Sequence, residues 1–89
     1  MEEAFIDPKP FGLHPRTVLK QSGSGMYAII KKRTSRIIMK DGEKILEEVR
    51  RIMHHAPGAT VRIETDAPVC SKTKHFLLAH GIEIFPLQP

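Results

Sequence analysis

The residue in this 89-residue chain whose type and position could carry covalent chemistry is Cys70, the only cysteine. It follows Pro68 and Val69, where a helix is expected to begin. The free N–H groups and the positive dipole end of a first helical turn favour a thiolate or a bound anion. Cys70 is therefore a candidate catalytic thiol. The alternative is a structural residue, because lone cysteines are often buried.

A basic stretch in the middle of the chain could carry a second kind of chemistry. Residues 26–55 hold eight Lys and Arg against four Asp and Glu, whereas 1–25 and 56–89 each hold three of either sign. The net charge of +4 therefore belongs to the middle. Clustered cations beside an open sheet suit phosphate contact, so we interpret four residues as candidate nucleic-acid-binding residues. They are Lys31, Lys32, Arg33 and Arg36; a solvated charged surface is the alternative.

Periodicity predicts the elements that position these residues. Residues 59–64 alternate as a half-buried strand, and residues 43–55 carry the apolar stripe of an amphipathic helix with Asp41 as its N-cap. A second helix is expected to start at residues 66–68 and to end before Gly81, and residues 82–85 form a closing strand. The predicted core consists of Leu46, Val49, Ile52, Val61, Ile63, Phe76, Leu77 and Ile82.

The basic residues fall between two short β-prone runs. Residues 26–30 and 36–39 are rich in β-branched and aromatic residues, which favours a basic hairpin. One continuous bent strand is the alternative, because residues 31–35 lack the Gly, Asn or Pro of a tight turn. The sequence thus predicts a small two-layer α/β (α+β) sandwich with the order β-β-α-β-α-β, whose second sheet face is exposed or is covered by the N-terminal arm or a neighbour.

The first 25 residues differ in composition from the rest. They contain Pro8, Pro10 and Pro15 and end in a segment rich in Gly and Ser. This composition is typical of an extended or flexible arm without regular structure. The arm also holds several apolar residues, among them Leu13 and Leu19, which favours part of it packing on the domain or on a second subunit. We therefore divide the chain into an extended arm, residues 1–25, and a single small domain, residues 26–89.

The segment around Cys70 resembles the second metal-ligand segment of zinc-dependent nucleoside and nucleic-acid deaminases. That family also has the order strand, strand, helix, strand, helix, strand, and it uses Pro-Cys-x-x-Cys and His-x-Glu motifs around a zinc-activated water. Here Val69 separates Pro68 from Cys70, and Thr73 occupies the position of the second Cys of the motif. Asp41 occupies the position of the His in the His-x-Glu motif. The resemblance implies a degenerate, deaminase-like protein.

The same segment is similar to glutaredoxins, in which the active Cys follows a strand and opens a helix. Cys70 and Thr73 would then bound a one-thiol variant of the motif. A thiol-dependent protein acting at Cys70 is accordingly the alternative to the nucleic-acid reading.

The sequence gives little support for a metal site or a membrane-spanning segment. His54 and His55 are adjacent, and adjacent helical residues do not form the four-apart pair of metal-binding helices. We expect them to satisfy carbonyls at the helix end and predict no metal and no cofactor. The sequence has no membrane-length apolar run and no signal peptide, and one cysteine suits a reducing compartment. These features predict a cytoplasmic protein without a membrane partner.

A homodimer is the third functional alternative, because so small a core gains stability from a partner chain.

Overall fold

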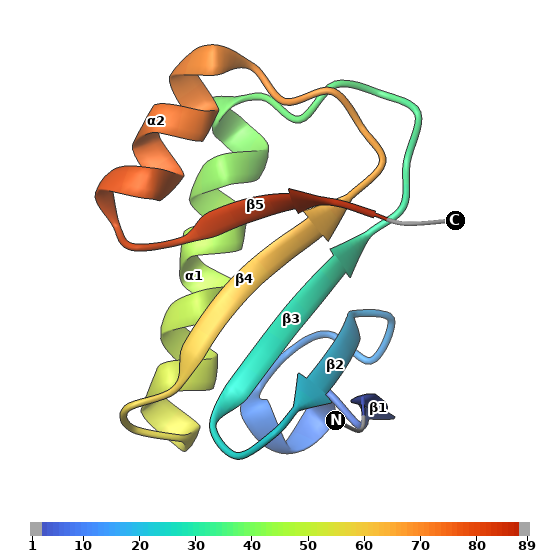
Figure 1. Ribbon diagram of the computed structural model, residues 1–89, viewed down its shortest axis with the longest axis vertical. Coiled ribbons are helices and arrows are strands. Elements are labelled where there is room, and N and C mark those ends of the chain that lie inside the picture. The colour runs from blue at the N-terminus through green and yellow to red at the C-terminus, as the bar shows by residue number, and fades with distance from the viewer. Residues whose placement is uncertain (1–2, 88–89) are drawn as a thin grey trace.

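The structure, a computed structural model, describes residues 3–87, and its elements form one sheet and two helices (Figure 1). This arrangement confirms the predicted α+β class and the order β-β-α-β-α-β, with one further strand at the start. The elements in chain order are β1 (Glu3–Ile6), the 3-10 turn η1 (Lys9–Phe11), β2 (Val18–Ser22), β3 (Met26–Lys31), α1 (Met39–His55), β4 (Thr60–Thr65), α2 (Ser71–Ala79) and β5 (Glu83–Pro86).

The five strands form a mixed sheet in the order β1-β2-β3-β4-β5. The first three strands are antiparallel neighbours, whereas β3, β4 and β5 run parallel. Parallel neighbours need a crossover, and α1 and α2 supply the two that this sheet requires. The carboxyl ends of β3, β4 and β5 therefore lie at one edge of the sheet, called the carboxyl edge below.

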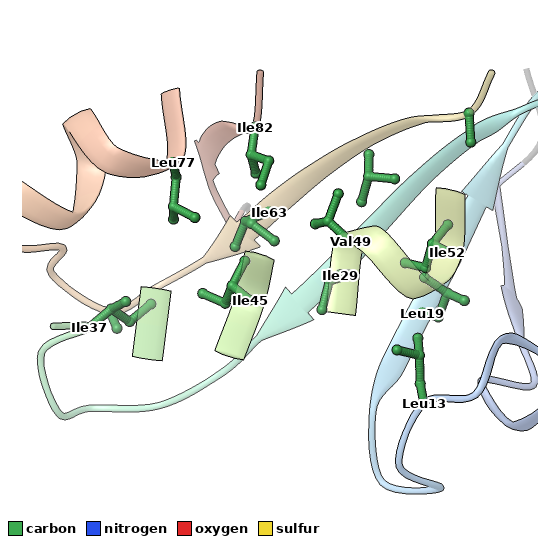
Figure 2. Close-up of a cluster of buried hydrophobic side chains, with 13 residues drawn as sticks. Leu13, Leu19, Ile29, Ile37, Ile45, Val49, Ile52, Ile63, Leu77 and Ile82 are labelled. Atoms are coloured by element: carbon green, nitrogen blue, oxygen red, sulfur yellow. The ribbon is translucent and has the colours of Figure 1, made fainter. Parts of the chain in front are cut away.

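The hydrophobic core lies between one face of the sheet and the two helices (Figure 2). Ile29 of β3 and Ile63 of β4 are fully buried in one cluster with Ile52 of α1 and Leu77 of α2. Most of the predicted core residues are buried as expected, while Leu46 and Phe76 are half-buried at its margin. The buried ones are Val49, Ile52, Val61, Ile63, Leu77 and Ile82.

The other face of the sheet is uncovered by helices. It presents Phe5 of β1, which is 72% exposed, and the charged Lys20, Arg62 and Glu64 from β2 and β4. Cross-strand pairing places Phe5, Lys20, Ala28 and Arg62 in one row, because residues opposite each other in a ladder share a face. The predicted second face of the two-layer sandwich is thus exposed.

The hairpin is formed by other residues than those predicted. β2 and β3 pair across the turn at residues 23–25, where Gly23 and Gly25 adopt left-handed φ values of 74° and 73°. The predicted strand at residues 36–39 is wrong: Ile37 forms only an isolated bridge to Val69, and Met39 already begins α1. Buried Ile37 is held by the β4–α2 loop, so it does not pair with β3.

The expectation that residues 1–25 lack regular structure is also wrong. The segment is extended, and Leu13 and Leu19 pack into the core as its apolar residues indicated, but β1 and β2 are regular strands that continue the sheet beyond β3. The three prolines stay outside both strands, which leaves β2 free to complete its hydrogen bonds.

Both helices begin elsewhere than predicted. α1 starts at Met39, so Asp41 stands inside its first turn and accepts a hydrogen bond from the N–H of Ile38 at 3.0 Å. α2 starts at Ser71 with Cys70 at its N-cap, and residues 66–68 belong to the preceding loop. There the Pro68 carbonyl accepts the Ile37 N–H at 2.8 Å, which ties the loop to the segment before α1.

Candidate nucleic-acid interface and thiol site

The predicted basic residues lie at the carboxyl edge of the sheet. Lys31 ends β3 and pairs with Thr65 at the end of β4. Residues 32–38 then follow this edge from β3 to α1. Ligands of open α/β sheets commonly bind beyond the carboxyl ends of parallel strands, so the position suits a binding site.

A cavity of about 720 Å³ opens at this edge against the uncovered sheet face. Its basic lining residues come from β2, from β3 and from the segments next to them: Arg16, Lys20, Lys31, Lys32 and Arg33. Phe5, Val18, Ile30 and Leu87 supply its apolar walls. Three of the four predicted cations thus share one cavity, while Arg36 lies farther along the loop.

Arg16 and Lys20 are site residues that the sequence interpretation missed. Arg16 lies just before β2 and Lys20 lies within it. The strand β2 runs antiparallel to β3, with Val18 opposite Ile30. The start of β2 therefore meets the end of β3 at the carboxyl edge. The alternation of Val18 and Lys20 against the buried Leu19 was the available signal, and the surrounding Pro and Gly obscured it.

Two of the four predicted cations are neutralised within the protein. Lys31 Nζ lies 3.0 Å and 3.2 Å from the two carboxylate oxygens of Glu48 on α1. Arg33 donates from Nη1 and Nη2 to both oxygens of Asp41, at 3.2 Å and 3.3 Å, and from Nε to Ser35. Bidentate pairs of this kind fix geometry as well as charge, so Arg33 shapes the loop.

The other two predicted cations are differently placed. Lys32 and Arg36 are exposed, and neither takes part in an ion pair in the described part of the chain. The same holds for Arg16. These three side chains contribute uncompensated positive charge at the carboxyl edge, and the exposed Lys44 and Lys74, which line neighbouring cavities and form no ion pair in the described chain, add to it.

Glu64 anchors a charge network on the uncovered sheet face. Glu64 is buried, with only 7% of its surface exposed. Its carboxylate accepts hydrogen bonds from Lys20 Nζ at 2.9 Å and from Arg62 Nε at 3.0 Å. Burial raises the pKa of Glu64, but the hydrogen bonds from Lys20 and Arg62 outweigh it, so its pKa lies below the ordinary value. Lys20 also pairs with Glu3 at 3.0 Å, and hydrogen bonds from its side chain to Glu64 and Glu3 raise its pKa.

Cys70 lies at the N-cap of α2 and its thiol is free and half-exposed. The polar N–H groups of Thr73 and Lys72 and the Thr73 hydroxyl, in the first turn of α2, lower the pKa of the Cys70 thiol, and the Arg36 charge adds to them. Desolvation opposes these effects without cancelling them. The position therefore stabilises a thiolate, as the sequence interpretation anticipated for a helix start.

Among residues 3–87, no group of three or more His, Cys, Asp or Glu side chains is placed to hold a metal ion. Of the two histidines expected to satisfy carbonyls at the end of α1, His55 makes an aromatic contact, with its ring 4.5 Å from that of Phe11. At the end of α2, the ring of His80 lies 5.0 Å from that of Phe76. None of the helices described here has the length and hydrophobicity needed to cross a bilayer.

Comparisons with known proteins place the fold without defining a family. No protein-family model matches the sequence, and no curated protein matches it. A solved structure described as a repair endonuclease from Pyrococcus abyssi superposes with a TM-score of 0.63 at 18% identity. The match covers 81% of this chain and 32% of the endonuclease, so the chain spans about a third of that protein. At this identity the likeness shows the class of fold, a small α+β domain shared with part of a nuclease.

Proposed function

We propose that this chain is a non-enzymatic module that binds nucleic acid at the carboxyl edge of its sheet. The observation that carries the proposal is a group of exposed cations there that lack an ion-pair partner within residues 3–87, of which Arg16, Lys32 and Arg36 lie on β2 and on the loop after β3 or next to them. Phosphate groups bind such side chains and release counterions, which supplies most of the affinity of a backbone-binding protein. A cytoplasmic location is part of the proposal.

Lys31 and Arg33 have a different role in this proposal. Their charges are already paired with Glu48 and Asp41, so they hold the loop in shape while the three unpaired cations contact phosphate. The cavity beside them, with Phe5 at its wall, offers apolar surface for a sugar or a base. The fold likeness to a protein described as a repair endonuclease is in keeping with a nucleic-acid partner.

The test is a fluorescence-anisotropy titration with labelled duplex and single-stranded DNA and RNA at low salt. We expect Lys32→Gln and Arg36→Gln to weaken binding. Arg50→Gln is the matched control, because Arg50 is exposed, has no ion pair in the described residues and lies on α1 beside a different cavity. Equal weakening by all three changes would point to net charge alone, and no binding by the wild-type chain at low salt would refute the proposal.

A homodimer through the uncovered sheet face is a second candidate. Phe5, Val18, Met26 and Phe85 are exposed large apolar side chains contributed by strands of this sheet. Apolar residues gathered on one face often mark an interface. Light scattering across a concentration series tests this candidate: a dimer that Phe5→Ser dissociates supports it, and a monomer at all concentrations rejects it.

A further inference from the structure

The cavity at the carboxyl edge has an apolar floor as well as charged walls. Val18 of β2 lies opposite Ile30 of β3 on the uncovered face of the sheet. Phe5 of β1 lies opposite Lys20, two residues along β2 from Val18 and on the same face. The side chain of Phe5 is 72% exposed and that of Val18 is 43% exposed, and both line the cavity with Ile30 and Leu87. Apolar side chains gathered in a concave surface with a polar rim mark a binding site.

Two exposed cations stand beside this apolar floor. Arg16 precedes Val18 by two residues and Lys32 follows Ile30 by two. Because Val18 and Ile30 are antiparallel partners, the chain carries both cations past the same end of the sheet, where both line the cavity. Neither has an ion-pair partner within residues 3–87, and Glu3, the acid that lines the cavity, already pairs with a lysine of β2 at 3.0 Å. Free positive charge and open apolar surface therefore meet in one concave site.

Duplex and single-stranded nucleic acid would meet this cavity differently. A duplex turns its phosphates outward and keeps its bases paired and stacked, so it reaches the cations at the rim and leaves the apolar floor uncovered. An unpaired base exposes both of its faces and stacks on an aromatic side chain while its phosphates remain beside cations. The cavity volume of about 720 Å³ lies within the range of roughly 300 to 1,000 Å³ of small-ligand pockets, which suits a single nucleotide unit.

We propose that this cavity receives an unpaired base, so that the module prefers single-stranded to duplex nucleic acid, and that Phe5 sets the preference. The inference rests on the proposed function, because the same cations supply the phosphate contacts. Phe5 belongs to a strand that is paired with β2, so its ring is held at the cavity before the ligand binds and little ordering is needed. Stacking tolerates every base, so the preference is for strandedness and not for sequence.

The test compares the binding of three labelled probes of equal length, on the order of 10 nucleotides, by fluorescence anisotropy. They are a single strand, the same strand in a duplex, and the strand with abasic central nucleotides, which keeps the phosphates and lacks the bases. We expect the intact single strand to bind most tightly. Phe5→Ala should weaken its binding by about 5- to 150-fold, the equivalent of one stacked base, and should leave duplex and abasic binding unchanged. Phe5→Tyr, which keeps the ring, should retain the preference.

Met26→Ala is the matched control, because Met26 is 45% exposed on the same sheet face but starts β3 at the far end from the cavity. Equal affinity for the intact and abasic strands would overturn this inference and leave the proposed function in place. The same holds for equal weakening of single-strand and duplex binding by Phe5→Ala, or for the same loss in Met26→Ala. Absence of binding to all three probes would instead overturn the inference and the proposed function together.

Discussion

Replacing Glu64 with Gln removes the charge at the centre of the network on the uncovered sheet face. Glu64 accepts hydrogen bonds from Lys20 at 2.9 Å and from Arg62 at 3.0 Å, and Arg62 Nη2 lies 2.8 Å from it. Breaking a buried ion pair costs about 3 to 5 kcal/mol. Here Lys20 keeps Glu3, Arg62 is partly exposed and Gln retains an acceptor, so we expect about 1 to 2 kcal/mol. That loss lowers the melting temperature by roughly 4 to 16 °C.

The pH dependence of this loss follows from the pKa of Glu64, which is lowered because the hydrogen bonds from Lys20 and Arg62 outweigh the effect of burial. A carboxyl whose pKa is lowered on folding contributes its full stability above its unfolded pKa, about 4.3, and loses it as pH falls through the folded pKa. The difference between wild type and Glu64→Gln should therefore be largest near neutral pH and shrink in acid.

Thermal and urea unfolding at pH 7 and at steps down to about pH 3 would measure both quantities. Glu43→Gln is the matched control, because Glu43 is exposed and forms no ion pair in the described chain. Equal stability of the two variants at pH 7, or a difference between wild type and Glu64→Gln that grows as pH falls, would refute the reasoning.

Three further predictions concern packing and the thiol. Leu77→Ala should cost about 2 to 5 kcal/mol, and the half-buried Leu46 less, as urea unfolding would measure; equal costs would contradict the burial difference. Gly42→Ala should destabilise α1 despite better helix propensity, because the new Cβ meets Thr73, and Thr73→Ser should relieve the effect in a double-mutant cycle. Cys70→Ser should leave nucleic-acid affinity unchanged in anisotropy titrations; a loss would move the binding site to α2.

The parts of the fold that depend on local periodicity could be predicted from the sequence. The apolar stripe of the helix that ends at His55 and the alternation around Val61 and Ile63 are confirmed, because each pattern lies within one element. β2 was missed because its alternation is short and lies between prolines and glycines. Only its pairing with β3 makes Leu19 a core residue.

The candidate site was predictable in part for the same reason. The local excess of charge identified Lys31, Lys32, Arg33 and Arg36, but it could not distinguish paired from unpaired cations. The partner of Lys31 is Glu48, 17 residues away on the next helix. Arg16 joins the edge only through the register of an antiparallel strand. Such contacts depend on tertiary structure and leave no signal in local composition.

The central claim is that unpaired cations at the carboxyl edge contact phosphate, and the salt dependence of duplex DNA binding tests it most directly. Three phosphate contacts by Arg16, Lys32 and Arg36 predict a slope of log affinity against log salt of about −2.7, at roughly 0.9 per contact. The double variant Lys32→Gln with Arg36→Gln should reduce its magnitude to about 0.9, while Arg50→Gln should leave it unchanged. An unchanged slope in the double variant, or the same reduction in the Arg50 control, would contradict the claim.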